Sequence, residues 1–290
     1  MLSSQGQFKL AYKRSLAGVP FTTLTEFTAV RASPRQVPSY DVHELKNRQS
    51  RYAVLIPVLE EGERILNQLR RMEFLRGKGD IILGDGGSKD STGDVSVLKD
   101  YCVRTLLIKT SAGKQSAQIR MLLDYGLEQG YEGFVLIDGN NKDGVEAIPA
   151  FFEAMDQGFD YIQGSRFVKG GAERNTPWDR KLAAVLLHAP VISLAAGFHY
   201  TDTTNGFRAL TRSVALDPRL QLFRDIFQSY EIHSYMATRI PRLGYRVKEL
   251  PVTRTYPANG NTPTKIHGLG GRGQMLKILF WAALSRYNPK

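Results

Sequence analysis

Residues 52–83 read YAVLIPVLEEGERILNQLRRMEFLRGKGDIIL, and this stretch decides the fold. The apolar run from Tyr52 to Ile56 predicts a strand, and the apolar residues of Glu63 to Leu75 recur at helical spacing. A second apolar run, Ile81 to Leu83, predicts the next strand. A strand, a helix and a strand in this order are typical of a parallel sheet that helices cover.

The same alternation continues along the chain. Further strands are predicted at Arg104 to Ile108, Phe134 to Ile137 and Tyr161 to Gln163, and further helices at Gln115 to Leu127 and Val145 to Met155. We therefore expect an α/β fold with a mostly parallel central sheet and helices on both faces. Residues 1–50 are rich in Ser, Thr, Arg and Pro and show no clean periodicity, so they are interpreted as an N-terminal extension of the domain.

The composition limits the classes of protein to consider. Of 290 residues, 42% are hydrophobic and 23% are charged, which is an ordinary globular balance. A single cysteine, Cys102, excludes a disulfide framework within the chain. The polar segment Met1 to Leu10 has no apolar signal core, so we expect a cytoplasmic setting. The net charge of +11 suits partners that carry phosphate: nucleotides, nucleic acid or an anionic membrane surface.

Two apolar segments could contact a membrane, although neither is long enough to span one. Leu182 to Phe198 is interrupted by His188 and Pro190, and it predicts either a buried helix pair or a membrane-touching hairpin. Gln274 to Leu284 contains Trp281 and has basic neighbours. We expect residues 266–290 to form a C-terminal amphipathic helix, which either lies on a bilayer surface or packs on the domain.

Polar clusters follow the predicted strands at the points where those strands end. In open α/β sheets ligands bind beyond the carboxyl ends of the strands, so these clusters mark the expected site. The clusters are Pro57 to Gly62, Gly84 to Asp90, Lys109 to Lys114 and Asp138 to Asp143. Acids, glycines and lysines at successive strand ends favour a nucleotide site over ordinary loops.

The individual clusters suggest particular chemistry. Asp85-Gly86-Gly87-Ser88 places a carboxylate on a tight turn that a base or ribose can approach, although alone it is only a turn. Asp138 and Asn140 offer two oxygens that could hold Mg²⁺ or Mn²⁺ against a diphosphate, and the alternative is an Asx-rich turn. The stretch from Gly164 to Arg180 is basic and suits phosphate oxygens, and the alternative is a solvated loop.

Taken in order, these segments resemble the family 2 glycosyltransferases of the GT-A fold, and among them the dolichol- or polyprenyl-phosphate mannose and glucose synthases. The resemblance covers Tyr52 to Lys265. It is carried by IPVLEEG (56–62), GDGGSKDST (84–92), SAGKQSA (111–117), IDGNNKDG (137–144), QGSRFVKGG (163–171), TDTTNGFRAL (201–210) and LGYRVKELPVTR (243–254). It implies a nucleotide-diphosphate-sugar donor and inverting transfer within a domain that spans residues 51–265.

The resemblance also implies roles for individual residues. Positions that contact the donor nucleotide match Pro57, Glu61, Asp85, Lys114 and Asp138. The metal pair matches Asp138 and Asn140, and phosphate-contacting arginines match Arg166 and Arg180. A segment that lines the active site supplies Asp202, Asn205 and Arg208, and a basic residue near the C-terminus matches Lys265. The catalytic set implied in this way is Asp202, Arg208, Arg166 and Arg180.

The chain departs from the family pattern around the metal. Asn140 stands where the second metal-binding acid is expected, and Lys142 replaces a glutamine that often follows as a ligand. We expect Mg²⁺ or Mn²⁺ as the cofactor, bound weakly because Asn140 brings no charge and the ammonium of Lys142 can partly take the place of the cation.

The expected activity is transfer of a sugar from a UDP- or GDP-sugar to a polyprenyl-phosphate-type lipid. One alternative is transfer to a glycan hydroxyl in cell-surface polysaccharide or lipopolysaccharide assembly, which requires a general base, with Asp202 favoured over Glu231. A different class of function is an inactive nucleotide-binding module. No aromatic-basic interleaving supports a nucleic-acid partner.

Overall fold

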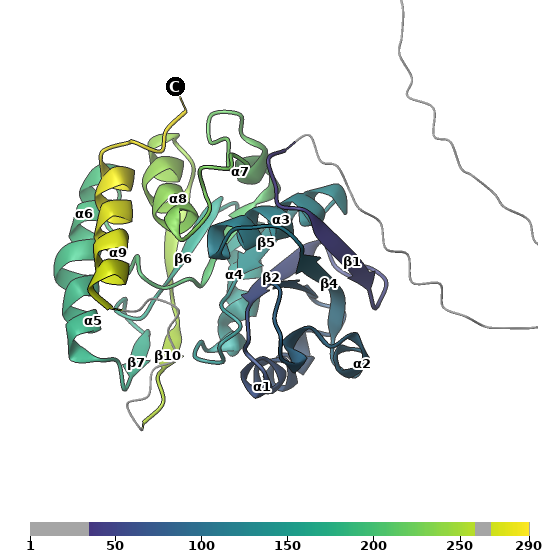
Figure 1. Cartoon of the computed structure of the whole chain (residues 1–290). Helices are drawn as coiled ribbons and strands as arrows, with labels where there is room; N and C mark the ends of the chain where they lie inside the picture. Colours follow the sequence, from purple (N-terminus) through teal and green to yellow (C-terminus); the bar gives the residue numbers. More distant parts are fainter. Residues whose placement is uncertain (1–34, 259–267, 290) are drawn as a thin grey trace, which may run out of the picture.

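The computed structural model describes residues 35–258 and 268–289, and within them eight strands form one sheet (Figure 1). The strand order is β1-β4-β3-β2-β5-β8-β6-β9. These strands are β1 (Tyr40–Glu44), β2 (Tyr52–Val58), β3 (Asp80–Asp85), β4 (Val103–Lys109), β5 (Gly133–Leu136), β6 (Tyr161–Ser165), β8 (Arg208–Thr211) and β9 (Val247–Pro251). A small second sheet pairs β7 (Ala172–Arg174) with β10 (Thr253–Thr255).

Helices connect the strands. The longer ones are α1 (Glu63–Arg71), α3 (Gln115–Glu128), α4 (Ile148–Asp156), α6 (Ala189–Ala196), α8 (Glu231–Arg242) and α9 (Gly268–Ala283). The shorter ones are α2 (Val95–Leu98), α5 (Trp178–Ala183), α7 (Arg212–Leu216), η1 (Glu73–Leu75), η2 (Ser91–Gly93), η3 (Val145–Ala147) and the π-helical turn η4 (Ala184–His188).

The sheet is mixed, with a parallel centre. β2 pairs in parallel with β3 and β5, β3 with β4, and β6 with β9. β8 is antiparallel to β5 and to β6 on either side of it, and β1 is antiparallel to β4. The predicted α/β fold with a mostly parallel sheet is confirmed, and each strand predicted from the sequence is present.

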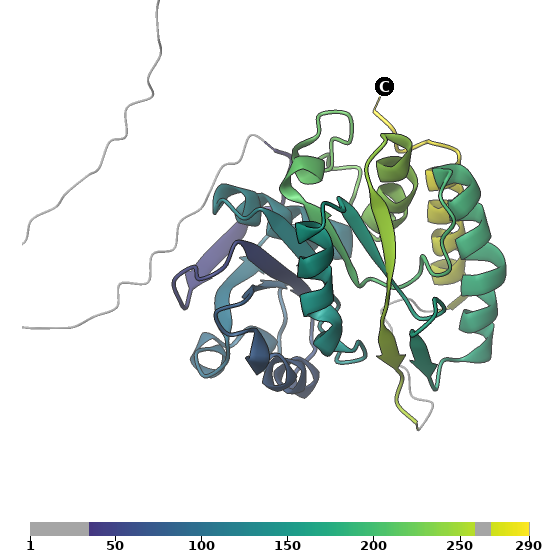
Figure 2. The same cartoon turned by 180° about the vertical axis from the view of Figure 1, so that it is seen from behind.

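Each face of the sheet has its own hydrophobic core, because successive side chains of a strand point to opposite faces. In β2, Ala53 and Leu55 pack with α3 and α8, whereas Val54 and Ile56 pack with α1 and α4. Figure 2 shows α4 in front of the sheet, and Figure 1 shows it behind. This two-sided burial explains why the strands read as continuous apolar runs.

The segment interpreted as an N-terminal extension contributes a strand to the sheet. β1 runs along β4 with Tyr40 opposite Lys109 and Glu44 opposite Thr105. This strand is only five residues long and pairs with a strand far along the chain, so the composition of residues 1–50 did not indicate it. Residues 1–34 of that segment lie outside the described residues.

The prediction of a buried helix pair at Leu182 to Phe198 is wrong. The segment belongs to one helical run, α5–η4–α6, which ends at Gly197 with a φ of 66°. Pro190 has no N–H to bond to the preceding turn, and the π-helical turn before it absorbs the change in register. The outer side of the run is open to solvent, since Leu186 is 70% exposed and Leu194 is 82% exposed.

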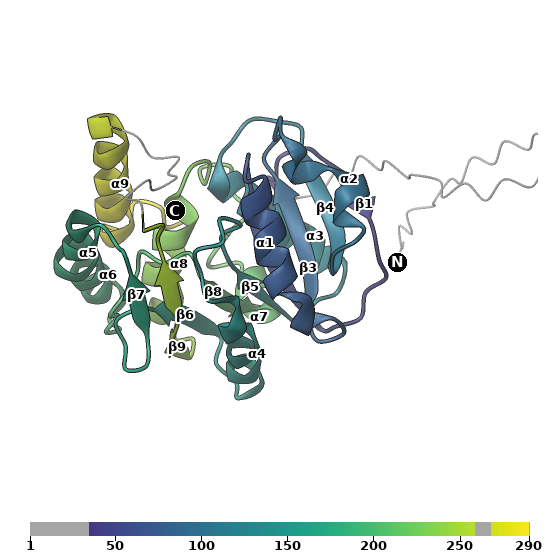
Figure 3. The same ribbon diagram turned by 90° about the horizontal axis from the view of Figure 1, so that it is seen from below.

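The predicted C-terminal helix is present as α9, and it packs on α6 and α8. Ile278, Leu279 and Ala282 are buried, whereas Phe280 and Trp281 are exposed. Figure 3 shows α5, α6 and α9 together at the end of the molecule opposite β1. In the described part of the chain, no helix combines the length and the apolar character needed to cross a membrane.

Candidate active site

The loops that follow β2 and β3 are tied to each other, as expected for one ligand site at adjacent strand ends. The backbone N–H of Glu60 donates to Ser88 Oγ at 2.8 Å. The N–H groups of Glu61 and Gly62 both donate to Thr92 Oγ1 at 2.8 Å. Ser88 and Thr92 come from the loop after β3, so the predicted nucleoside-contacting loops form one rigid wall.

The predicted nucleoside residues lie on this wall. Pro57 is buried within β2 beside Gly84 of β3. The carboxylate of Asp85 accepts from the N–H of Ser88 at 3.1 Å and from its hydroxyl at 2.5 Å, which fixes the turn that follows β3. The side chain of Glu61 forms an ion pair with Arg64 at 2.7 Å.

A glutamine of α3 supports the same strand ends from below. Gln118 Nε2 donates to the carbonyl oxygens of Val58 at 2.7 Å and of Gly84 at 2.9 Å. This buried side chain therefore holds the ends of β2 and β3 at a fixed spacing. It directly follows the SAGKQSA segment, and nothing in the sequence distinguished it from other helical polar residues.

Asp138 lies beyond the end of β5 and is the centre of a polar network. Its Oδ1 accepts from Gln115 Nε2 at 2.9 Å, and its Oδ2 accepts from Arg254 Nη2 at 3.2 Å. Asn140 Nδ2 also points at Oδ2, at 3.4 Å. Gly206 makes this position possible, because a Cβ there would lie 2.9 Å from Asp138 Oδ1.

Arg254 joins Asp138 to a second carboxylate. Its Nη1 donates to both oxygens of Asp143, at 2.8 and 2.6 Å. Burial raises the pKa of Asp143, and the guanidinium of Arg254 opposes that rise. Burial likewise works against a charged Asp138, but Arg254 brings the pKa of Asp138 below its usual value. Both acids are therefore paired with the same cation.

Arg166 and Asp202, both in the predicted catalytic set, form a buried bidentate pair. Arg166 Nε donates to Asp202 Oδ2 at 2.6 Å and its Nη2 to Oδ1 at 3.0 Å. Thr204 donates to the same carboxylate through its N–H and its hydroxyl, each at 3.0 Å. Although burial opposes it, these bonds hold the pKa of Asp202 below its usual value, so the carboxylate stays ionised.

Arg208, a member of the predicted catalytic set, lies inside the fold. Its guanidinium is buried and donates to Tyr161 Oη at 3.0 Å and to the carbonyls of His233 at 2.9 Å and Asn205 at 2.5 Å. Its physical role is to hold the turn at Asn205, which in turn places Gly206 against Asp138.

Other predicted residues stand outside this network. In residues 35–258 and 268–289, Lys114 is exposed at the N-terminus of α3 and Arg180 is exposed on α5. Glu231 accepts the N–H of Ser229 at 2.7 Å at the start of α8. Lys265 lies outside the described residues.

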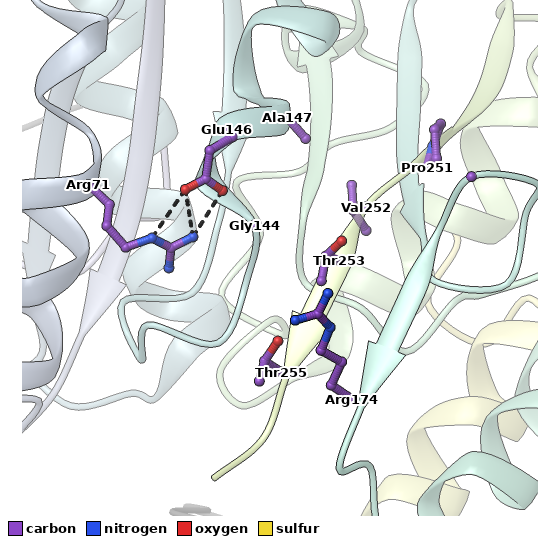
Figure 4. A pocket seen from close by; sticks show the side chains of 10 residues that line it. Arg71, Gly144, Glu146, Ala147, Arg174, Pro251, Val252, Thr253 and Thr255 are labelled. Carbon is purple, nitrogen blue, oxygen red and sulfur yellow. Dashed lines mark hydrogen bonds and ion pairs between the residues drawn. The ribbon is translucent and has the colours of Figure 1, made fainter. Parts of the chain in front are cut away.

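A cavity of about 280 Å³ lies beside β10 (Figure 4). Thr253 and Thr255 line it, and Arg254 between them points to the other face of the strand, toward Asp138 and Asp143. The ion pair of Arg71 with Glu146 closes one side of the cavity, as Figure 4 shows. None of the predicted site residues lines it, so this cavity is separate from the network around Asp138.

Sequence reasoning missed three residues of the network. Arg254 ends the segment LGYRVKELPVTR, Asp143 belongs to IDGNNKDG, and Gln115 to SAGKQSA, but no role was given to any of them. The signal available was their presence in the family-like segments. Their mutual contact depends on the fold, because Arg254 lies 111 residues from Asp143 and 116 residues from Asp138 along the chain.

The donors around Asp138 fit a divalent cation poorly. Both carboxylate oxygens of Asp138 already accept hydrogen bonds. Asn140, at the position of the second metal-binding acid, has a neutral amide side chain. In the part of the chain that the structure describes, no group of three or more His, Cys, Asp or Glu side chains is placed to hold a metal ion. Lys142, two residues beyond Asn140, is a cation itself.

The parallel sheet with its paired acids, amides and arginines at the strand ends defines a glycosyltransferase of the GT-A fold, and comparison with known proteins supports this. No family model matches the chain. The glucosyl-3-phosphoglycerate synthase of Mycobacterium tuberculosis, solved with Mn²⁺, UDP and phosphoglyceric acid, superposes with a TM-score of 0.58 at 16% identity, covering 82% of this chain and 79% of that one.

Sequence relatives identify the family. The undecaprenyl-phosphate mannosyltransferase of Micrococcus luteus is 32% identical over 208 residues, which are 70% of this chain and 83% of that protein. The polyprenol monophosphomannose synthase of Mycolicibacterium smegmatis is 29% identical over 240 residues, which are 81% and 88% of the two chains. The chain belongs to the family 2 glycosyltransferases, in the branch of the polyprenyl-phosphate mannose synthases.

Proposed function

We propose that this enzyme transfers a hexosyl group from a UDP- or GDP-sugar to a polyprenyl phosphate, with inversion at the anomeric carbon. The observation that carries the proposal is the gathering of Lys142 and Arg254 around Tyr256, with Lys142 also interacting with Glu61 of the wall formed by the loops after β2 and β3. A nucleoside would lie against the wall, and its diphosphate would face the cations. The names of the relatives support the lipid-phosphate acceptor.

The leaving nucleoside diphosphate gains negative charge as the glycosidic bond breaks. Fixed cations that face this charge stabilise the transition state more than the ground state. The acceptor phosphate oxygen attacks the anomeric carbon from the face opposite to the leaving group, forms the new C–O bond and inverts the centre.

A phosphate acceptor is already an anion, so no general base is required. Both candidate bases are engaged: Asp202 pairs with Arg166, and Glu231 accepts the N–H of Ser229. A base for a sugar hydroxyl must be within reach of the proton and ready to accept it. The engagement of Asp202 and Glu231 therefore favours the phosphate acceptor over the hydroxyl acceptor.

A lipid acceptor requires access to a bilayer, and we assign this contact to the outer sides of α5, η4, α6 and α9. Trp178, Leu182 and Leu186 recur at helical spacing and are exposed. On α9, Phe280 and Trp281 are exposed, and basic side chains surround these positions: Arg180, Lys181, Lys277 and Arg286. Apolar residues among basic ones match an anionic bilayer surface.

The activity is tested with radiolabelled GDP-mannose, UDP-glucose and other nucleotide sugars, each mixed with polyprenyl phosphate or with the unphosphorylated polyprenol. We expect a sugar-phosphate lipid from the phosphorylated acceptor only, with the anomeric configuration opposite to that of the donor. Transfer to hydroxyl acceptors but not to polyprenyl phosphate would overturn the proposed acceptor. Nucleotide binding without turnover on any acceptor would favour the inactive module.

A further inference from the structure

The protein itself places two cations beside Asp138. The carboxylates of Asp138, which is partly exposed, and of buried Asp143 lie with the buried side chains of Arg254 and Lys142 in one group. Arg254 pairs with both carboxylates, and Lys142 brings a second cation to the group without an added ion. A divalent cation at Asp138 would lie beside Lys142 and Arg254 and be repelled by both.

Lys142 lies among the groups to which we assign donor binding. Its side chain is buried, and its ammonium lies 5.2 Å from the centre of the Tyr256 ring. It interacts electrostatically with Asp138, beyond β5, and with Glu61, in the loop after β2. The ammonium therefore interacts with both the loop after β2 and Asp138, which is where we place the diphosphate.

The pKa of Tyr256 indicates the sign of the electrostatic potential around its hydroxyl. Burial alone raises the pKa of a tyrosine, yet the guanidiniums of Arg254 and Arg166 and the ammonium of Lys142 bring the pKa of Tyr256 below its ordinary value. The Arg254 guanidinium carbon lies 5.7 Å from the ring centre. The space around this hydroxyl is thus positive before any ligand arrives.

We propose that Lys142 and Arg254 supply the positive charge that relatives of this fold obtain from a divalent cation, so that the donor nucleotide binds this enzyme without metal. Lys142 contacts the diphosphate directly, and Arg254 occupies one oxygen of Asp138 in an ion pair. The inference rests on the proposed nucleotide-sugar donor, and it adds the means by which the diphosphate is neutralised.

The first experiment is calorimetric titration of UDP and GDP into the full chain, once with excess EDTA and once with Mn²⁺. We expect one nucleotide to bind with an affinity that differs by less than about threefold between the two conditions, a difference under ~1 kcal/mol. Binding with Mn²⁺ but not with EDTA would overturn this inference and leave the proposed donor intact. No binding in either condition would instead overturn the proposed donor.

Variants test the residue itself. Lys142→Met keeps the length of the side chain without the charge, and we expect it to weaken nucleotide binding in EDTA by about tenfold or more, because a charge-assisted contact is lost. Lys99→Met, at an exposed lysine after α2, is the matched control and should bind as the wild type does. Circular dichroism and thermal unfolding verify that each variant is folded. Unchanged binding by folded Lys142→Met would refute the role of the ammonium.

A gain of metal dependence provides an independent check. The double variant Asn140→Asp, Lys142→Gln restores an acid and removes the competing ammonium. We expect it to bind Mn²⁺ together with the nucleotide, seen as loss of the free Mn²⁺ signal in electron paramagnetic resonance, whereas the wild type leaves that signal unchanged. Equal Mn²⁺ uptake by the wild type and the double variant would contradict the proposal.

Discussion

The carboxylate of Asp202 is fully buried and receives hydrogen bonds from Arg166 and Thr204, and this leaves Arg166 balanced inside the protein. Asp202→Asn removes the negative partner from a buried guanidinium, which typically costs about 3–5 kcal/mol. We expect the free energy of unfolding in urea to fall by that order. Asp100→Asn, at an exposed carboxylate, should change it little. A fall in turnover of Asp202→Asn without loss of stability would favour the base role of Asp202 over its role as the ion-pair partner of Arg166.

The imidazole of His233 makes the free energy of unfolding depend on pH. Its burial, reinforced by Arg208, lowers its pKa to about 3, although Asp138 opposes the shift. In the unfolded chain the pKa is about 6.5, so protons bind the unfolded state first and stability falls as the pH drops from about 6.5 toward 3. Between pH 7 and 5 this amounts to about 2 kcal/mol.

The measurement is urea unfolding of the wild type and of His233→Leu at both pH values. We expect the wild type to lose about 2 kcal/mol more than the variant over this interval. The comparison of slopes removes the direct effect of the substitution on packing. Parallel slopes for the two proteins would show that His233 is protonated in the folded state or does not titrate on unfolding.

At the level of single elements, α9 has one side buried on α6 and α8 and the other exposed. Leu279→Ala should lower the free energy of unfolding by about 2–5 kcal/mol, because it leaves a cavity where Leu279 is fully buried. Phe280→Ala, one residue further on the exposed side, should change stability by less than about 0.5 kcal/mol. Thermal and urea unfolding check both, and similar losses for the two variants would contradict this orientation of α9.

The elements that were predicted well from the sequence are the central strands, whose apolar pattern follows directly from their burial. β2, β3 and β5 lie in the sheet centre, and burial on both faces makes each a continuous apolar run. β1 and the π-helical turn η4 were not predicted. β1 forms because it pairs with β4. The π-helical turn η4 accommodates a change in helical register before Pro190, and the spacing of apolar residues does not reveal such a change.

The site residues likewise fall into those that could be predicted from the sequence and those that could not. The loops after β2, β3 and β5 were predictable, because parallel strands carry their carboxyl ends to one side of the sheet. The engagement of Asp202 and the internal position of Arg208 were not, since the same residue types at a strand end can face either ligand or core. The bond of Arg254 to Asp138, across 116 residues, depends on how β9 and β10 return beside β6 and β7.

For the whole molecule, the net charge of +11 and the exposed apolar side chains of α5, α6 and α9 predict salt-sensitive binding to anionic vesicles. We expect the protein to sediment with vesicles of phosphatidylglycerol but not of phosphatidylcholine. Binding should weaken as salt rises from about 0.1 M to about 1 M, because the Debye length shortens from ~10 Å to ~3 Å.

The double variant Phe280→Ala, Trp281→Ala separates the helical face from charge in general. We expect it to bind phosphatidylglycerol vesicles less tightly at low salt, by about tenfold, since two large apolar side chains no longer enter the interface. Leu216→Ala, at an exposed leucine of α7, is the control and should bind as the wild type does. Equal binding of all three proteins would exclude α9 from the membrane contact.

The position of β1 has a consequence for producing this enzyme in quantity. A recombinant form trimmed at residue 50, where the composition changes, would lack β1 and leave one backbone side of β4 without partners. An open strand such as this recruits strands from other molecules, and aggregation follows. Recombinant forms for crystallisation or assay should therefore begin at or before about residue 35, so that β1 covers β4 and prevents self-association.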